Sequence, residues 1–363
     1  MAPREVVIVG AGVMGAAAAW QLARRGERIT VVEQFEDGHE RGSSHGESRI
    51  FRLGYPDQFW VRLGCEALAD WHELELESGV PLIAATGSVD HGDAASITTV
   101  LAAFDAEGVP VELLTPAVAS QRWPGMRFEG AVVFQAGGGR IAAGAARMAM
   151  IEQAQQRGAR FLWNTPVRAV ETNGDRARVV IDDATIDADA VVVAAGAWCA
   201  SLLADVVSLP PLRVTQESVF HFTPREQHSW WPSFIHHDAG TGTIYGLETP
   251  GEGVKLAEHG TGPEVNPSTR DGLVDPGSRE RIVQFVESWM PGLAPVPVTE
   301  ITCLYTKTPS EDFVIDRVGP IVVASPCSGH GFKFAPLVGR LVADVVGGAD
   351  APERFRLPRS VSP

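Results

Sequence analysis

The strongest constraint on the fold comes from the pattern that begins at residue 5. Residues 5–9 are a mostly β-branched run, which is typical of a strand buried on both faces of a sheet. A glycine-rich loop follows, and then come a small-residue helix at 16–23 and a second strand at 29–32. Strand, loop, helix and strand predict one βαβ unit with a right-handed crossover. We therefore expect a Rossmann-like domain at this end of the chain.

The loop of this unit has the glycines that a dinucleotide site needs. Gly10 permits a tight turn, Gly12 lets the backbone approach a pyrophosphate, and Gly15 allows close packing of the helix. The helix N-terminus offers unpaired N–H groups and a positive dipole end. Glu33 lies at the end of the second strand, where a carboxylate can accept both ribose hydroxyls. The pattern predicts a bound dinucleotide, but it does not separate FAD from NAD.

Later segments predict two returns to this nucleotide domain. They are helices at 59–75, 142–155 and 335–346 and buried strands at 190–194 and 321–324. The pieces between them carry short alternating segments and turn residues, as an antiparallel sheet does. We expect an α/β (α+β) protein with two interleaved domains. The nucleotide domain is expected at residues 1–80, 140–208 and 305–363, and the substrate domain at 81–139 and 209–304.

Charge and cysteine content exclude several classes of function. A net charge of −15 argues against binding to nucleic acid or to an anionic membrane face. The four cysteines are widely spaced and lie in no zinc-type cluster, so neither a disulfide framework nor a metal site is expected. The apolar runs are shorter than the roughly 18 residues of a membrane helix, and no signal peptide fits before residue 5. We expect a cytoplasmic protein.

Three further segments resemble a known family. They are GSSHGESRIFR at 42–52, CLYT at 303–306 and SGHGFKF at 328–334. In their order and spacing they are similar to signature segments of the monomeric sarcosine oxidase and N-methyltryptophan oxidase family. The resemblance covers nearly the whole chain. It implies FAD rather than NAD, a monomer, and oxidation of a small amino-acid substrate by oxygen.

By this resemblance, Cys303 carries the flavin through a bond to the 8α-methyl carbon. A thiolate that adds to the oxidised flavin needs cationic surroundings, which Arg49 is a candidate to supply. Two alternatives stay open at this point. Cys303 is an ordinary buried cysteine in the first, and Cys327, closer to the Gly-His-Gly loop, is the attachment point in the second.

The resemblance also implies the residues that meet substrate and oxygen. Arg52 and Lys333 are the two cations that hold a substrate carboxylate, since two cations repay the desolvation of one anion better than one does. The alternative is that both are surface charges with buried stems. Lys255 is the lysine that faces the flavin and assists its reaction with oxygen. The remaining pocket residues implied in this way are Tyr245, His259, Tyr305 and His330.

Several other residues are expected to touch the cofactor. Ser43 and Ser44 are expected at the pyrophosphate, and Val167 beside the adenine. His45 lies in a flavin-contacting loop, although a lone histidine is often a structural one. The other expected contacts are Val13, Met14, Gln34, Arg41, Gly196, Trp198, Gly329, Gly331 and Phe332.

The implied reaction moves a hydride equivalent from the carbon beside the amine nitrogen to the flavin. The imine then hydrolyses, and oxygen leaves as hydrogen peroxide. A flavin dehydrogenase with a partner acceptor and a non-catalytic dinucleotide-binding protein are the alternatives. Glu248 and Cys327 depart from the family pattern, so sarcosine itself is not assigned. Larger N-methyl amino acids, cyclic imino acids and glycated amino acids remain open, as does the choice of the bond that is oxidised.

Overall fold

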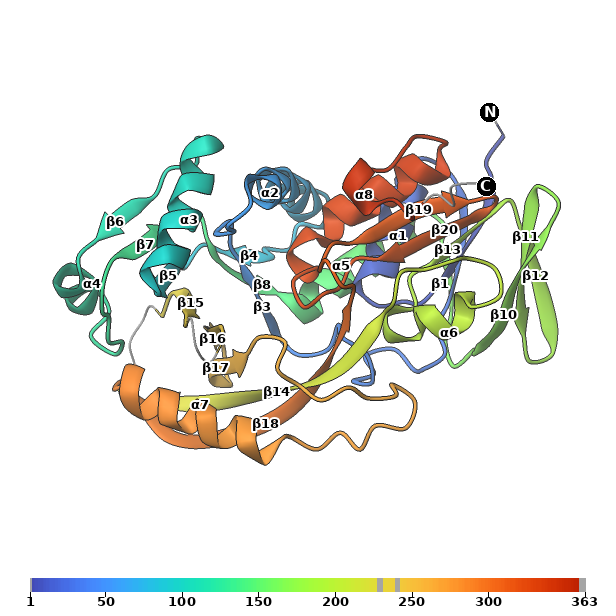
Figure 1. Ribbon diagram of the computed structural model, residues 1–363. Coiled ribbons are helices and arrows are strands. Elements are labelled where there is room, and N and C mark those ends of the chain that lie inside the picture. Colours follow the sequence, from blue (N-terminus) through green and yellow to red (C-terminus); the bar gives the residue numbers. More distant parts are fainter. Residues whose placement is uncertain (1, 227–230, 239–241, 359–363) are drawn as a thin grey trace.

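The computed structural model describes residues 2–226, 231–238 and 242–358. A six-stranded sheet lies in one half of the molecule, with strand order β19-β20-β13-β1-β2-β9 (Figure 1). Its strands are parallel except for β19, which pairs antiparallel with β20. The bounds are β1 Glu5–Val9, β2 Arg28–Val32, β9 Arg160–Leu162, β13 Ala190–Val193, β19 Val314–Val318 and β20 Ile321–Ser325.

The two faces of this sheet are covered differently, because side chains alternate along each strand. Val6 and Ile8 of β1 pack with the helices α1, α2, α5 and α8. Val7 and Val9 pack on the other face, against α6 and a three-stranded antiparallel sheet. The helices are α1 Val13–Arg24, α2 Gln58–Ser78, α5 Ala143–Gln156, α6 Cys199–Leu203 and α8 Ala335–Val346. The small sheet is β10 Val167–Asn173, β11 Arg176–Ile181 and β12 Ala184–Ala188.

An eight-stranded sheet forms the other half, in the order β18-β14-β17-β16-β15-β5-β7-β6. Phe220, Phe222, Val254 and Leu256 of this sheet pack with Phe285 of α7 in a second core. The strands are β5 Ser88–Gly92, β6 Glu112–Leu114, β7 Val132–Gln135, β14 Arg213–Pro224, β15 Ser233–His237, β16 Ile244–Thr249, β17 Gly253–Glu258 and β18 Leu293–Lys307. The helices of this half are α3 Ala94–Ala106, α4 Pro116–Arg122 and α7 Pro276–Trp289.

The α/β class and the Rossmann-like unit predicted from the sequence are confirmed, and two details of the second half differ. Its sheet is antiparallel except for one parallel pair, β15 with β5. Helices also lie where only strands were expected, because Asp93 and Asp275 cap the first turns of α3 and α7. The alternating segments in front of these caps had favoured strands.

A second small sheet connects the two halves. It contains β3 (Ser48–Phe51), β8 (Gly139–Ala142) and β4 (Ile83–Ala84), all antiparallel. Two of the expected domain boundaries fall inside strands, at 139/140 in β8 and at 304/305 in β18. Strand β8 belongs to the small connecting sheet, and β18 pairs along its length with β14 of the eight-stranded sheet.

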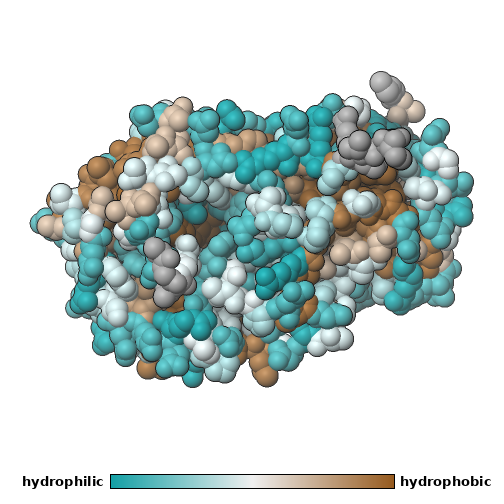
Figure 2. All heavy atoms as spheres, viewed as in Figure 1, coloured by the Kyte–Doolittle hydropathy of each residue, from teal (hydrophilic) through white to brown (hydrophobic). Residues whose placement is uncertain are grey.

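Figure 2 shows hydrophilic residues over most of the visible surface, with hydrophobic residues gathered in separate patches. Within residues 2–226, 231–238 and 242–358, no helix combines the length and the apolar character that crossing a membrane requires.

Candidate active site

A cavity of about 850 Å³ lies between the two large sheets. Its lining comes from the carboxyl ends of β1, β13 and β20, from the start of α1, and from β14, β16, β17 and β18. Ligands of open α/β sheets bind at the carboxyl ends of parallel strands. The volume falls within the range of about 300 to 1,000 Å³ that is usual for cofactor sites.

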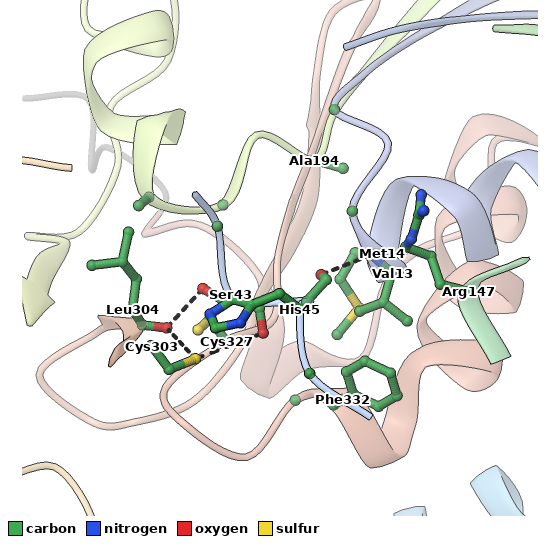
Figure 3. Close-up of a pocket in the computed structure, with 18 of the residues that line it drawn as sticks. Val13, Met14, Ser43, His45, Arg147, Ala194, Cys303, Leu304, Cys327 and Phe332 are labelled. Carbon is green, nitrogen blue, oxygen red and sulfur yellow. Dashed lines mark hydrogen bonds between the residues drawn. The ribbon is translucent and has the colours of Figure 1, made fainter. Parts of the chain in front are cut away.

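The glycine loop forms one wall of this cavity. Gly10 has φ +101°, and a Cβ there would lie 2.6 Å from the carbonyl oxygen of Ala194. A Cβ on Gly12 would lie 3.1 Å from Ser44 Oγ, so the loop leaves room for a ligand only because side chains are absent. Helix α1 begins at Val13, its N-cap residue Gly12 has no side chain to cap it, and the Val13 N–H donates to Ser44 Oγ at 3.0 Å. Figure 3 shows Val13 and Met14 at this end.

Glu33 closes the far end of the cavity as a carboxylate. Its oxygens accept from the amide of Ala11 at 2.8 Å and from that of Phe35 at 3.1 Å. Burial alone would raise the pKa of Glu33, but hydrogen bonds from His39 and Ala11 outweigh it and lower the pKa. An ionised acceptor therefore lies where the sequence predicts a ribose.

The cavity brings together most of the residues expected at the cofactor. Gly15 and Arg41 are the two that do not line it. A Cβ on Gly15 would lie 1.8 Å from the Gly10 oxygen, so Gly15 serves the packing of α1 against the turn. Arg41 is exposed, with its guanidinium 5.1 Å from the centre of the Phe35 ring. The expected contacts that do line the cavity are Gly10, Gly12, Val13, Met14, Glu33, Gln34, Ser43, Ser44, His45, Arg49, Val167, Gly196, Trp198, Cys303, Gly329, Gly331, Phe332 and Lys333.

Cys303 reaches the cavity from β18. Its Sγ lies 3.8 Å from the carbonyl oxygen of Ser43 and 3.8 Å from that of Leu304 (Figure 3). Arg49 donates to the carbonyl oxygens of Ser43 and His45, and its charge therefore stays close to the thiol. Burial raises the pKa of Cys303, and Arg49 offsets only part of the rise. The expected cationic surroundings exist, but they do not ionise the thiol in the protein chain alone.

Cys327 and Glu248, where the sequence departs from the family pattern, differ in position. Cys327 lines the cavity, and its Sγ accepts from the amide of Thr306 at 3.2 Å. Glu248 lies outside the lining and pairs with Arg140 at 3.5 Å. Cys327 therefore shapes the pocket directly, while Glu248 does not.

Two cations meet at the other end of the cavity. Lys333 Nζ donates to the Tyr55 hydroxyl at 2.8 Å and to the His330 carbonyl at 3.1 Å. The Arg52 guanidinium lies 4.8 Å from the centre of the same Tyr55 ring. Burial lowers the pKa of Lys333, and Arg52 lowers it further. Asp90 is the acidic group beside them, 3.8 Å from the Arg52 guanidinium. An anionic ligand would relieve the repulsion between the two cations.

Lys255 projects into the cavity from β17. Its Nζ donates to the Ser48 carbonyl oxygen at 2.6 Å, and the residue is only 6 % exposed. Burial lowers the pKa of Lys255 to about 7, with a further decrease from Arg49 and opposing increases from Cys303 and Glu252. The ammonium therefore changes its charge near neutral pH.

A tyrosine pair and a histidine complete the substrate side. The Tyr245 hydroxyl shares a hydrogen bond with Tyr305, and burial raises the pKa of Tyr245 to about 12. The His259 ring centre lies 5.5 Å from that of Tyr305. Burial lowers the pKa of His259 to about 4, so its imidazole is neutral at neutral pH. All three residues line the cavity.

The two loop histidines have different surroundings. His330 Nδ1 lies 3.2 Å from the Tyr55 hydroxyl and Nε2 3.1 Å from the Glu311 carbonyl oxygen. These bonds make His330 a support for Tyr55 and, through it, for Lys333. The buried Nε2 of His45 has no hydrogen-bond partner within the described part of the chain. His45 thus presents an unused polar atom at the cavity wall.

Comparison with known proteins decides between the possible dinucleotides. The model of the family described as FAD dependent oxidoreductase matches residues 5–345. The chain belongs to this family. The predicted resemblance and the predicted class, an FAD-dependent oxidoreductase, are both confirmed.

Relatives in this FAD-dependent oxidoreductase family are similar over almost their whole length. Monomeric sarcosine oxidase of Arthrobacter sp. (strain TE1826) is 30% identical, over 94% of this chain and 92% of the relative. N-methyl-L-tryptophan oxidase of Yersinia pestis (strain Pestoides F) is 28% identical, over 93% of this chain and 94% of the relative. The solved structure of NikD, an unusual amino acid oxidase essential for nikkomycin biosynthesis, superposes with a TM-score of 0.88 at 27% identity, covering 100% of this chain and 99% of that one.

The cavity fits the FAD that the family uses. Gly331 supports this, because a Cβ there would lie 1.7 Å from the Pro326 oxygen and would push the loop into the space beside Met14. The uncapped start of α1, the Glu33 carboxylate and the unpartnered His45 nitrogen add donors and acceptors along the same wall. The adenosine end of FAD would lie along Glu33 and the glycine loop, and the flavin ring would lie near Cys303.

Sequence reasoning missed three residues that shape the site. Tyr55 holds Lys333 and lies under Arg52, and its place three residues after Arg52 was the available signal. Asp90 comes from β5, far away in sequence, and no motif announced it. Arg147 of α5 lines the nucleotide end and donates to the Ala11 carbonyl oxygen at 3.3 Å. The only sequence signal for Arg147 was a cation near the start of a predicted helix.

Proposed function

We propose that this protein is an oxidase of small N-alkyl or cyclic secondary amino acids that carries FAD covalently on Cys303. The observation that carries the proposal is the pair Arg52 and Lys333, two cations at the end of the cavity opposite to the nucleotide loop. A buried lysine beside a second cation is costly unless an anion joins them, and Asp90, 3.8 Å from Arg52, is already paired with His237. A substrate carboxylate is such an anion, and the curated relatives named above act on N-methyl amino acids by their names.

Arg52 and Lys333 would bind the carboxylate and fix the substrate in one orientation. Tyr55 holds both cations in place. Tyr245, Tyr305 and the neutral His259 would line the amine side, where the raised tyrosine pKa values keep the hydroxyls protonated as hydrogen-bond donors. The bound FAD supplies the acceptor for a hydride equivalent from the carbon beside the amine nitrogen.

Lys255 supports oxygen, rather than a partner protein, as the final acceptor. A buried cation beside the cofactor stabilises negative charge that appears on oxygen only during its reduction, which is the condition for catalysis. Hydrogen peroxide and an imine that hydrolyses would be the products. A dehydrogenase that passes electrons to another protein has no use for this cation. We also propose a soluble cytoplasmic monomer, with the domain division expected from the sequence.

The test compares pairs of substrates that differ only in the carboxylate. Each N-methyl or cyclic amino acid should release peroxide, and its decarboxylated amine should react poorly, with a loss of several kcal/mol for the unmatched cations. Peroxide release across sarcosine, larger N-methyl amino acids, cyclic imino acids and glycated amino acids identifies the class. Equal turnover of an acid and its decarboxylated amine would contradict carboxylate binding by Arg52 and Lys333. Turnover only with artificial acceptors would favour a dehydrogenase.

A further inference from the structure

A buried histidine lies next to Lys255, and the chemistry described so far does not use it. His221 of β14 is the direct cross-strand partner of Lys255 in β17. Opposite residues of an antiparallel pair project from the same face of the sheet. Val219 and Lys255 line the cavity, whereas Phe220 and Phe222 pack on the other face. His221 therefore lies on the cavity side, beside Lys255.

His221 bridges the interior and the surface. Its ring is 2 % exposed, and Nε2 lies 3.2 Å from Glu252 Oε2. Glu252 belongs to the turn between β16 and β17, and its side chain is 39 % exposed. The other ring nitrogen, Nδ1, is buried without a hydrogen-bond partner in the part of the chain that the structure describes. One nitrogen thus meets a solvated carboxylate, and the other is free to act inside the protein.

The titratable groups that act on the charge of Lys255 come from three neighbouring segments. Arg49 of β3 lowers its pKa, while Cys303 of β18 and Glu252 of the turn raise it. Burial and Lys255 together lower the pKa of His221 to about 4, so its imidazole is neutral at neutral pH. A neutral imidazole can accept a proton at one nitrogen and release one from the other.

Oxygen reduction needs a route that carries protons to the oxygen site. This step rests on the proposed function, in which O2, two electrons and two protons give one hydrogen peroxide. The hydride equivalent taken from the substrate brings both electrons and one proton. The amine nitrogen releases a second proton when the imine forms, so the overall reaction balances, but a proton must still be delivered at the oxygen site. Lys255, which is 6 % exposed, would have to be recharged after giving it up.

We propose that Glu252 and His221 are the path by which protons from solvent reach Lys255. Glu252 takes a proton from water and passes it to Nε2 of His221. From the Nδ1–H tautomer, Nδ1 gives its proton to Nζ of Lys255, so the neutral imidazole keeps one proton, now on Nε2, and returns to the Nδ1–H tautomer before the next turnover. Each step is a proton transfer, and no electron moves along the path.

The first test measures the protonation of Lys255 directly in the holoenzyme. The chain contains only three lysines, Lys255, Lys307 and Lys333, so 15N labelling of lysine Nζ should give three signals. The signal lost in Lys255→Met is that of Lys255. Glu252→Gln should lower the pKa of Lys255, because it removes a carboxylate that raises it. Glu264→Gln, which removes an exposed carboxylate paired with Arg213, should leave it unchanged. An equal pKa in wild type and Glu252→Gln would overturn the proposal.

The second test measures flavin reoxidation in stopped flow. His221→Ala should slow it by about a hundredfold, the lower end of what a positioned proton-transfer group contributes, and added imidazole should restore it. Anaerobic reduction by substrate should change little. His236→Phe is the matched control, since His236 is a buried histidine of β15 in the same sheet that packs on Trp289. If His221→Ala does not fold, Glu252→Gln should still slow reoxidation.

The two proposals can fail separately. Normal reoxidation in Lys255→Met would contradict the assignment of Lys255 as the oxygen site, and with it the proposed oxidase function. Slow reoxidation in Lys255→Met with normal rates in both His221→Ala and Glu252→Gln removes only the proton path. Slow reoxidation in His221→Ala that imidazole does not restore also overturns the path, because it indicates a structural role for His221.

Discussion

Cys303 is held against the loop of residues 42–46 by the Ser43 carbonyl, and Arg49 binds the same loop. Cys303→Ala should abolish covalent attachment, because no other sulfur replaces it at this position. Acid-precipitated wild-type protein should stay yellow, while the variant should give a colourless precipitate and free FAD in the supernatant. Cys65→Ala, at an exposed cysteine of α2, is the control and should behave as wild type. A yellow precipitate from Cys303→Ala would move the bond to Cys327.

Lys255 allows a prediction with a magnitude. A unit charge about 5 Å from the developing anion is worth roughly 3 kcal/mol at an effective dielectric constant near 20. Lys255→Met should therefore slow flavin reoxidation by about a hundredfold, while anaerobic reduction falls much less. Stopped-flow absorbance measures both steps. Lys307→Met, which removes a lysine paired with Glu311, should leave both rates near those of wild type. Loss of substrate reduction alone would make Lys255 a substrate-binding residue.

At the scale of single residues, short motifs predicted what lies inside them. The segment at 42–52 predicted Arg49 and Arg52 as site residues, and SGHGFKF predicted Lys333. All three line one cavity. Asp90 could not be predicted, because it reaches Arg52 only through the pairing of β5 with β15 and β7. Contacts made by tertiary pairing leave no trace in local sequence.

At the scale of elements, the crossing of α1 and α8 depends on one missing side chain. A Cβ on Gly339 of α8 would lie 2.4 Å from the Ala17 carbonyl oxygen of α1. Gly339→Ala should push the helices apart and lower the free energy of unfolding by about 1 to 3 kcal/mol, as overpacking does. Thermal unfolding followed by flavin fluorescence measures the change. Gly137→Ala, in an exposed turn without close neighbours, is the control, and equal stability of the two variants would contradict this packing.

Strongly periodic or capped elements were the ones that the sequence could predict. The run at 5–9 gave β1, and the apolar stripe at 335–346 gave α8 with the observed bounds. Helices α3 and α7 were missed although Asp93 and Asp275 stand at their starts. Their surroundings alternate like strands, so the cap was the only local signal for a helix.

At the scale of the whole molecule, buried histidines should make the fold sensitive to acid. Burial lowers the pKa of His45, His221 and His259 to about 4, whereas unfolded histidines titrate near 6.5. The unfolded chain therefore binds more protons between pH 6.5 and 4, and stability should fall as the pH drops through this window. Each histidine contributes up to about 1.4 kcal/mol per pH unit. Urea unfolding at pH 7.5, 6.5 and 5 measures the loss; a free energy of unfolding that stays constant down to pH 5 would contradict the burial of these rings as neutral groups.

The strand order of the six-stranded sheet has a consequence for how a cell makes this protein. A ribosome produces β1 first, but its neighbour β13 comes about half a chain later, and β20, which completes the other side of β13, later still. Until β13 is made, one edge of β1 stays open, although β2 already pairs with the other edge, and the face of α1 that packs on α8 waits longer still. Such surfaces invite aggregation of the nascent chain. Synthesis of this enzyme should therefore depend on chaperones that shield its first βαβ unit, and flavin can be captured only after translation has passed β20.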